Sequence, residues 1–340
     1  MTSIDSAAGK TARAAVRYIE AGAGDAGQRV DNFLARHLRD LPRSRLYRLL
    51  RKGEVRVNGR RVRPDHRLAT GDRVRLPPVL RVSERPARQP SAALRQLASG
   101  AILHEDADLI VLDKPAGVAV HGGSGISFGL IEALRAARPE LTELELVHRL
   151  DRDTSGCLLI AKRRAVLRTL HALLRERDLE KRYLALVCGR WTLGSKLIDL
   201  PLVTNRRQGG ERVVKVDAGG LSAVSRFTPI EHFGGTATLM EVVIGTGRTH
   251  QIRVHAAFAG HPVAGDEKYG DRECNRQLAD VGLRRMFLHA SSVAFRWQRD
   301  DTDGFAIEAP LDQDLLGVLE RLRQLRRGRR APPASGHGET

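Results

Sequence analysis

The chain is poor in aromatic residues and in cysteine, and it has no long apolar run. Only 4% of its 340 residues are Phe, Trp or Tyr, which argues against the aromatic belt of a membrane-surface protein. No apolar run approaches the ~18 residues that a membrane-spanning helix requires. The first 24 residues also lack the continuous apolar segment of a secretory signal. We therefore expect a cytoplasmic protein without a membrane partner.

The chain also lacks the residue spacings of common metal and nucleotide sites. Cys157, Cys188 and Cys274 show no CxxC spacing, which argues against a zinc site and a disulfide framework and predicts reduced thiols. No H-E-x-x-H pattern occurs. The glycine-rich stretch after His121 lacks the lysine and hydroxyl spacing of a phosphate-binding P-loop. We expect neither a metal nor a cofactor.

Positive charge is what the chain has in excess. It carries 57 Lys and Arg against 40 Asp and Glu, a formal net charge of +17. Between residues 36 and 63 there are eleven basic residues and only two acids. Each phosphate that a basic side chain neutralises releases counterions, so this excess favours a nucleic acid as partner.

The basic segment has a clear local pattern. Apolar residues recur at helical spacing around Phe33 and again around Leu49, which predicts two short helices. Two short strands around the Asn58-Gly59 turn and a further strand over residues 68–76 follow. Residues 27–80 thus resemble the S4 RNA-binding module. The candidate RNA contacts in this module are Arg36, Arg43, Arg45, Arg48 and Lys52.

The chain divides into five segments by composition and periodicity. Residues 1–24 are expected to be disordered, and residues 81–100, rich in Pro, Ser, Ala and Arg, read as a linker. Residues 101–325 mix strands and helices in one large α+β domain. The basic tail, residues 326–340, is expected to be disordered.

The densest cluster of ionisable residues lies at residues 148–156, His-Arg-Leu-Asp-Arg-Asp-Thr-Ser-Gly. Apolar runs precede and follow it, which predicts a loop between two strands. Asp151 lies between Arg149 and Arg152, whose charges favour the ionised carboxylate that a nucleophile or general base requires. A turn that merely pairs its own ions is the alternative that these residues leave open.

A series of motifs accompanies this loop in the large domain. They are Lys-Pro-Ala-Gly at 114–117 with His121, Lys-Arg-Tyr at 181–183, Gly-Arg-Thr-His-Gln-Ile-Arg-Val-His at 247–255, His-Pro at 261–262 with Asp266 and Tyr-Gly at 269–270, and Phe-Leu-His-Ala at 287–290. The series resembles the large family of pseudouridine synthases that modify rRNA and tRNA uridines. The resemblance implies a catalytic domain with a central mixed β-sheet and an active site in a basic cleft.

The resemblance also implies roles for individual residues. Asp151 corresponds to the essential catalytic carboxylate, and Arg253 to the arginine that pairs with it. Tyr183 corresponds to the aromatic residue over the flipped base, where it can stack and help to remove the C5 proton. Positioning of RNA or of the loop is expected for Arg149, Arg152, Thr154, His121, Arg248 and His250. A metal site built from His148, His250 and His255 is disfavoured because the usual carboxylate or thiolate ligands are missing.

The substrate implied by the resemblance is 23S rRNA, free or within an assembling large ribosomal subunit. The same chemistry on tRNA or on another rRNA site is one alternative. A ribosome assembly factor without catalysis, built on the S4 module, and a metal-dependent nuclease are two others. We expect a monomer.

Overall fold

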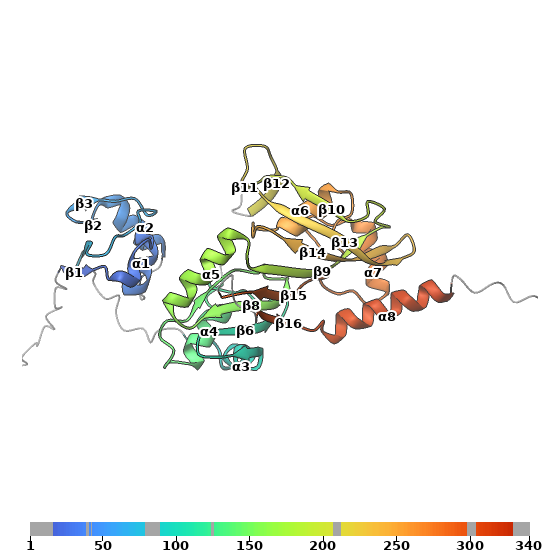
Figure 1. Cartoon of the computed structure of the whole chain (residues 1–340), viewed down its shortest axis with the longest axis horizontal. Helices are drawn as coiled ribbons and strands as arrows, with labels where there is room; N and C mark the ends of the chain where they lie inside the picture. Colours follow the sequence, from blue (N-terminus) through green and yellow to red (C-terminus); the bar gives the residue numbers. More distant parts are fainter. Residues whose placement is uncertain are drawn as a thin grey trace, which may run out of the picture. The chain divides into compact units, whose positions relative to one another are not determined.

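The computed structural model describes residues 16–38, 41, 43–78, 89–123, 126–206, 212–297 and 304–328. The chain divides into two compact units, residues 1–88 and 89–340 (Figure 1). No described helix is both long enough and apolar enough to cross a membrane. Residues 1–15, the expected linker over 81–88 and the tail beyond 328 lie outside the described residues.

The first unit is a small antiparallel sheet with two helices. The strand order is β1-β4-β2-β3, formed by β1 (Arg17–Glu20), β4 (Arg73–Leu76), β2 (Arg56–Val57) and β3 (Arg60–Arg61). The helices are α1 (Val30–His37) and α2 (Arg43–Lys52), preceded by the short 3-10 helix η1 (Ala23–Asp25). Their apolar faces bury Phe33, Leu34 and Leu46, so the two predicted helices and their stripe are present.

The two ends of this sheet differ in how far apart in sequence the residues that form them lie. The Asn58-Gly59 turn has positive φ at both residues, 49° and 77°, as an Asn-Gly hairpin turn requires. Strand β1, in contrast, lies inside the stretch that we expected to be disordered. Its four residues are too short to show a period, and they are ordered by antiparallel pairing with β4, about fifty residues further along the chain.

The second unit is organised around a ten-stranded mixed sheet. Its main path runs β10-β13-β14-β9-β15-β8-β6-β5, with β16 on β15 and β7 on β8. The strands are β5 (Ile102–Glu105), β6 (Leu109–Lys114), β7 (Glu145–Leu146), β8 (Ser155–Ala161), β9 (Glu180–Cys188), β10 (Lys196–Asp199), β13 (Val224–Phe233), β14 (Ala237–Ile244), β15 (Leu288–Phe295) and β16 (Phe305–Glu308). Among the described strands only β8 and β15 pair in parallel, which confirms the α+β class with a central mixed sheet.

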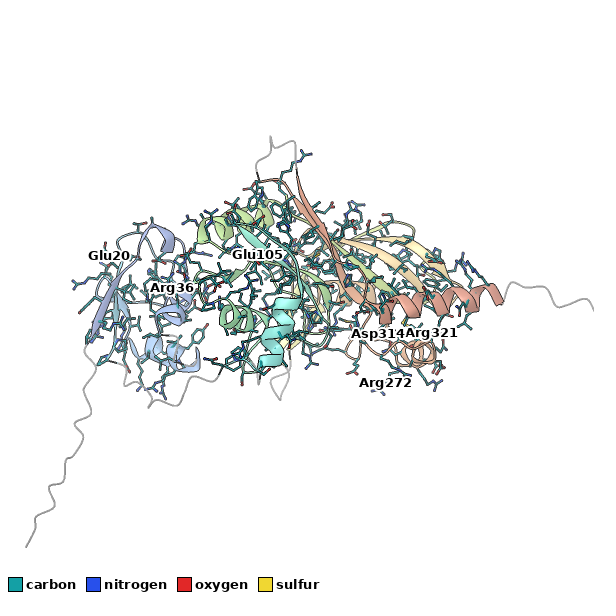
Figure 2. The ribbon with its side chains drawn as sticks, turned by 90° about the horizontal axis from the view of Figure 1, so that it is seen from below. Glu20, Arg36, Glu105, Arg272, Asp314 and Arg321 are labelled. Atoms are coloured by element: carbon teal, nitrogen blue, oxygen red, sulfur yellow. A yellow bond between two sulfur atoms is a disulfide. The ribbon has the colours of Figure 1, made fainter. Side chains whose placement is uncertain are left out.

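Helices and a separate hairpin complete the second unit. They are α3 (Ala92–Gly100), α4 (Leu130–Ala137), α5 (Arg164–Glu176), α6 (Gln251–Phe258), α7 (Arg272–Asp280), α8 (Gln313–Gly328) and the hairpin of β11 (Leu202–Arg206) and β12 (Arg212–Val216). Helix α3 lies in the expected linker, where the Ser91 side chain caps it by accepting from the Leu94 N–H. Helix α8 continues three residues past the expected domain end. Its Arg321, labelled in Figure 2, donates from Nε to the Val281 carbonyl at 2.6 Å.

The cysteines depart from the expectation of three reduced thiols. Cys188, at the end of β9, and Cys274, in α7, form a disulfide with their Cα atoms 6.1 Å apart. They are 86 residues apart in sequence, so the search for local cysteine spacing does not find the pair. Cys157 is free and buried in β8, where burial raises the pKa of its thiol to about 12.

Candidate active site

The loop that carries Asp151 joins β7 to β8, as predicted. Strand β8, which follows the loop, is buried at every position and so holds the end of the loop in place. At its entry the Leu159 N–H donates to Nε2 of His148 at 3.2 Å. At its exit Gly156 has a φ of 103°, and a Cβ there would overlap the carbonyl of Ala290 on β15. Glycine is required at this crossing because the neighbouring strand approaches too closely for a side chain.

Lys114, at the end of β6, is hydrogen-bonded to the loop. Its side chain is fully buried, and Nζ donates at 2.8 Å to the carbonyls of Pro115, Val118 and Arg152. Burial lowers its pKa to about 7, and the carboxylates of the loop oppose that shift. Three acceptors match the three N–H groups of an ammonium. The motif of Lys114 is one of the series that resembles the synthase family, but no role for the lysine itself was predicted from the sequence.

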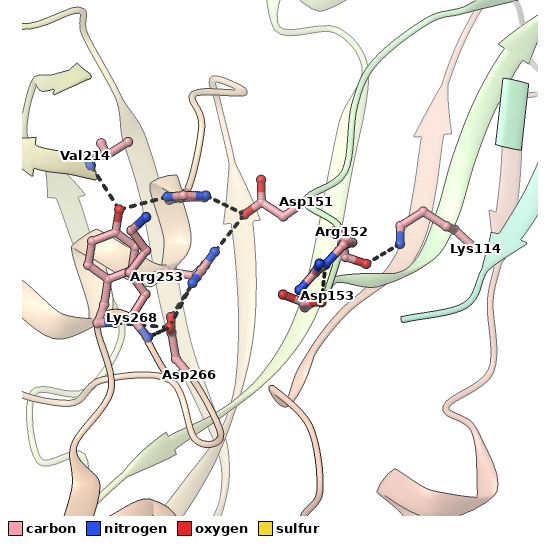
Figure 3. A network of polar contacts seen from close by, with 10 residues as sticks. Lys114, Asp151, Arg152, Asp153, Val214, Arg253, Asp266 and Lys268 are labelled. Carbon is pink, nitrogen blue, oxygen red and sulfur yellow. Dashed lines mark hydrogen bonds and ion pairs between the residues drawn. The ribbon is translucent and has the colours of Figure 1, made fainter. Parts of the chain in front are cut away.

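Asp151 faces helix α6 rather than the arginines beside it in sequence. Arg253 Nη1 lies 3.4 Å and His250 Nε2 lies 3.9 Å from Asp151 Oδ2 (Figure 3). The expected stabilisation by Arg149 and Arg152 is not seen, because Arg149 is exposed and Arg152 pairs with Asp153 at 3.2 Å. The positive charge at Asp151 therefore comes from a helix about one hundred residues further along the chain.

Arg253 is itself held by a second carboxylate. Asp266 has a fully buried side chain and accepts from Arg253 Nε at 2.6 Å and Nη2 at 2.8 Å. Burial alone would raise the pKa of Asp266, but the bonds and charge of Arg253 and two backbone N–H groups lower it below its ordinary value. Asp266 and Asp151 thus bind opposite sides of one guanidinium. Asp266 was not among our candidate residues, although it stands in one of the motifs.

His250 is held by a chain of hydrogen bonds that runs from Val214 through Tyr269. The Val214 N–H donates to Tyr269 Oη at 3.0 Å, and Tyr269 Oη lies 2.8 Å from His250 Nδ1. Burial lowers the pKa of His250 and favours the neutral imidazole. In the tautomer in which Tyr269 donates to Nδ1, the imidazole proton lies on Nε2, toward Asp151. His250 adopts φ 54°, a left-handed conformation just before α6.

Tyr183 lies in β9 and is buried, with 6% of its surface exposed. Burial and the charge of Asp151 raise the pKa of its phenol. A phenol that keeps its proton is suited to stacking or donation. The expectation that Tyr183 helps to take the C5 proton is therefore not supported by its surroundings, because a protonated phenol is not a base.

The remaining candidates in this unit do not form one cluster. Thr154 is buried at the loop exit, and its N–H donates to the Asp151 carbonyl at 3.2 Å. Arg248 donates to the Ser222 carbonyl at 3.0 Å. His121 Nδ1 lies 2.7 Å from the Gly122 carbonyl oxygen, and His255 binds Ser225 and Leu200. In the described part of the chain no group of three His, Cys, Asp or Glu side chains could hold a metal ion.

The basic residues of the first unit differ in exposure. Arg48 and Lys52 are exposed and Arg45 is half-buried. Arg36 instead pairs with Asp25 at 2.8 Å and lies over the ring of Phe33. The side chain of Arg43 lies outside the described residues. A hollow in this unit, which the sequence did not reveal, is lined by Arg60, Arg61, Arg63 and Arg67 together with Asp65 and Asp72.

Comparisons with known proteins decide the family. The RNA pseudouridylate synthase family matches residues 108–258, and the S4 domain matches residues 28–74. "Ribosomal large subunit pseudouridine synthase C" of Yersinia pestis is 54% identical over 318 residues, which cover 93% of this chain and 98% of the relative. The chain belongs to the RNA pseudouridine synthases. The resemblance seen in the sequence, and with it the S4 module, is confirmed.

Other relatives agree with this assignment. The protein of the same name from Escherichia coli K12 is 51% identical over 321 residues, covering 93% of this chain and all of the relative. The solved structure of human RNA Pseudouridylate Synthase Domain Containing 4 is 25% identical with a TM-score of 0.56, covering 68% of this synthase and 97% of the human chain. Asp151, Tyr183 and Arg253 all fall within the matched family region, whereas Asp266 lies just beyond it.

Proposed function

We propose that this synthase converts specific uridines of 23S rRNA to pseudouridine, with Asp151 as its catalytic carboxylate. The observation that carries the proposal is the placement of Asp151. Its carboxylate is 26% exposed, lies in the loop that leads into the buried strand β8, and pairs with the buried Arg253. The names of the relatives, which refer to the large ribosomal subunit, support the choice of RNA.

The chemistry needs few groups. The N1–C1′ bond of uridine breaks, the uracil turns, C5 bonds to C1′, and the C5 proton is lost while N1 gains one. No electrons are exchanged with the protein, so the reaction itself demands no cofactor. A carboxylate beside the sugar and a surface that holds the freed base are the minimum. In this proposal Asp151 provides the first, and Tyr183, protonated and facing the same space, stacks on the base.

Arg253 and His250 orient Asp151 in this proposal. The guanidinium keeps the carboxylate ionised and fixes one of its oxygens. The neutral imidazole, with its proton on Nε2, can keep a hydrogen bond to Asp151 when the negative charge of this carboxylate is lost during the reaction. Both groups are preorganised by Asp266 and Tyr269, so that little reorganisation is needed during the reaction.

Access to the uridine requires base flipping, which costs a few kcal/mol. Phosphate contacts offset this cost, and the S4 unit contributes exposed arginines for them. Part of the proposal is that Arg48 and Lys52, with the hollow around Arg63, engage the rRNA while the large domain modifies it. We also propose that the synthase acts as a monomer in the bacterial cytoplasm, where rRNA is made.

The test is release of tritium from C5-labelled uridine in unmodified 23S rRNA, with tRNA as a second substrate and with neither metal nor nucleotide added. We expect release from 23S rRNA by the wild type and a loss of at least about 10⁴-fold in Asp151→Asn. Asp153→Asn is the matched control, because Asp153 pairs with exposed Arg152 and not with Arg253. Release from tRNA alone would contradict the substrate, and binding without release would favour an assembly factor.

A further inference from the structure

Lys181 is a buried cation that pairs with no residue in the part of the chain that the structure describes. It lies in β9, two residues before Tyr183, and only 7% of its surface is exposed. No oxygen within the described ranges accepts a hydrogen bond from Nζ, and burial alone lowers its pKa to about 8. A desolvated ammonium without a partner destabilises a protein by several kcal/mol. Its presence beside the proposed catalytic groups therefore points to an anion that binds with the substrate.

The ammonium group of Lys181 lies beside a turn that contains glycine. Gly247 belongs to the turn between β14 and α6, and a Cβ at Gly247 would lie 3.8 Å from Lys181 Nζ. Gly247 is exposed, and its N–H has no acceptor among the residues that the structure describes. The turn is rigid, since Gln251 accepts from the Thr246 hydroxyl at 2.7 Å and from the Arg248 N–H at 3.0 Å.

A second cation flanks the same turn. Arg177 ends α5 in the left-handed conformation, φ 65°, and its Nε lies 3.9 Å from the position of a Cβ at Gly245. The turn then leads into the N-terminus of α6, the positive end of the helix dipole. The turn thus has an ammonium beside Gly247, a guanidinium beside Gly245 and, at the exposed Gly247, a backbone N–H with no described acceptor, and these are groups that bind a phosphate.

The position of this site relative to Tyr183 suits a nucleotide. Side chains two residues apart in a strand point to the same face about 7 Å from each other, and Lys181 and Tyr183 are both buried on that face. A base stacked on Tyr183 would bring a phosphate of its own nucleotide to about the same distance. We propose that Lys181, Gly247 and Arg177 bind a phosphodiester group of the RNA adjacent to the flipped uridine. This inference rests on the proposed role of Tyr183.

The first experiment compares Lys181→Met with the wild type as full-length proteins. We expect KM for 23S rRNA to rise about 10-fold with kcat changed less than about 3-fold, because one phosphate contact is lost. The slope of log affinity against log salt should fall by about one. The melting temperature should stay the same or rise, because methionine keeps the buried stem and removes the desolvated charge. Lys196→Met, at an exposed position on β10, is the matched control.

A second variant and a second probe make the test specific. Gly247→Ala adds one methyl group in front of Nζ at an ordinary contact distance, so it should raise KM without unfolding the turn. RNA fragments that carry a neutral methylphosphonate 5′ or 3′ of the modified uridine identify which phosphate is bound. The wild type should lose affinity for one of them, and Lys181→Met should bind both fragments equally.

Two outcomes would overturn the inference. One is a lower melting temperature of Lys181→Met with unchanged KM and salt slope, which would make the ammonium structural. The other is equal loss of affinity for the methylphosphonates in both proteins. Failure of the proposed function gives a different pattern, because the wild type would then release no tritium from 23S rRNA while the salt slope and melting temperature could still be compared.

Discussion

The two units of this synthase use charge in opposite ways. Around Asp151 the buried cations Arg253 and Lys114 are held by oxygens, Arg253 by the carboxylate of Asp266 and Lys114 by three backbone carbonyls. In the S4 unit Arg48, Arg60 and similar residues point into solvent. A charge that must define a geometry is fixed by partners, whereas a charge that must attract a polyanion is more effective when it is free and hydrated.

The strongest test of this contrast is Asp266→Asn. The amide keeps the size of the side chain but makes the two-bond partner of Arg253 neutral, so that Asp151 is the one remaining carboxylate among its described partners. We expect kcat to fall about 10²–10³-fold with little change in KM, because misplacement of a catalytic group by about 1 Å has an effect of this size. Tritium release at saturating rRNA measures it. Unchanged kcat would show that Arg253 is oriented without its second carboxylate.

Lys114→Met tests the same principle on stability. Three carbonyls would lose the same fully buried donor at once, so the free energy of unfolding should fall by about 2–4 kcal/mol. Urea unfolding of the intact chain measures the change. Lys162→Met is the matched control, since Lys162 pairs with half-buried Glu105 near the surface and should lose less than about 1 kcal/mol. Equal losses in the two variants would contradict the anchoring role.

Tyr269→Phe is expected to have a smaller effect on the rate. The variant keeps the ring near Arg253 but removes the hydroxyl between Val214 and His250. Nitrogen-15 spectra of labelled imidazole should show His250 protonated on Nε2 in the wild type and a mixture of tautomers in the variant. We expect kcat to fall about 10-fold. In a His250→Gln background the same change should have no further effect, and an additive loss would contradict the chain of bonds.

The smallest effect on catalysis is expected in the S4 unit. Combined replacement of Arg48, Arg60 and Arg63 by Gln should raise KM about 10-fold and reduce the salt dependence of binding, while kcat and the melting temperature stay unchanged. These side chains are exposed and no described residue pairs with them. A fall in kcat or a loss of stability would contradict the division in which the S4 unit attracts the RNA and the large domain holds the catalytic groups in place.

Local patterns accounted for much of the fold. The loop around Asp151, the Asn58-Gly59 turn and the two helices around Phe33 and Leu49 were predictable because they depend on residues close in sequence. The partners of Asp151 were predictable only in part. Arg253 and His250 stand in a readable motif, whereas the role of Asp266 depends on a fold-back of the chain after α6, and the role of Lys114 on β6 lying beside β8.

Three of the errors share one physical cause. Strand β1 is ordered by β4, Asp151 pairs with Arg253 about one hundred residues further along the chain, and Cys188 bonds to Cys274, 86 residues later. Each depends on contacts between residues far apart in sequence. Short-range propensity does not contain that information.

The disulfide has a topological consequence. Together with the backbone it closes residues 188–274 into a covalent ring, and this ring contains α6, with Arg253, and the segment that carries Asp266 and Tyr269. While the bond is intact, one proteolytic cut anywhere in the ring cannot divide the protein. The two fragments would migrate together in a denaturing gel and would part only after a thiol reductant is added.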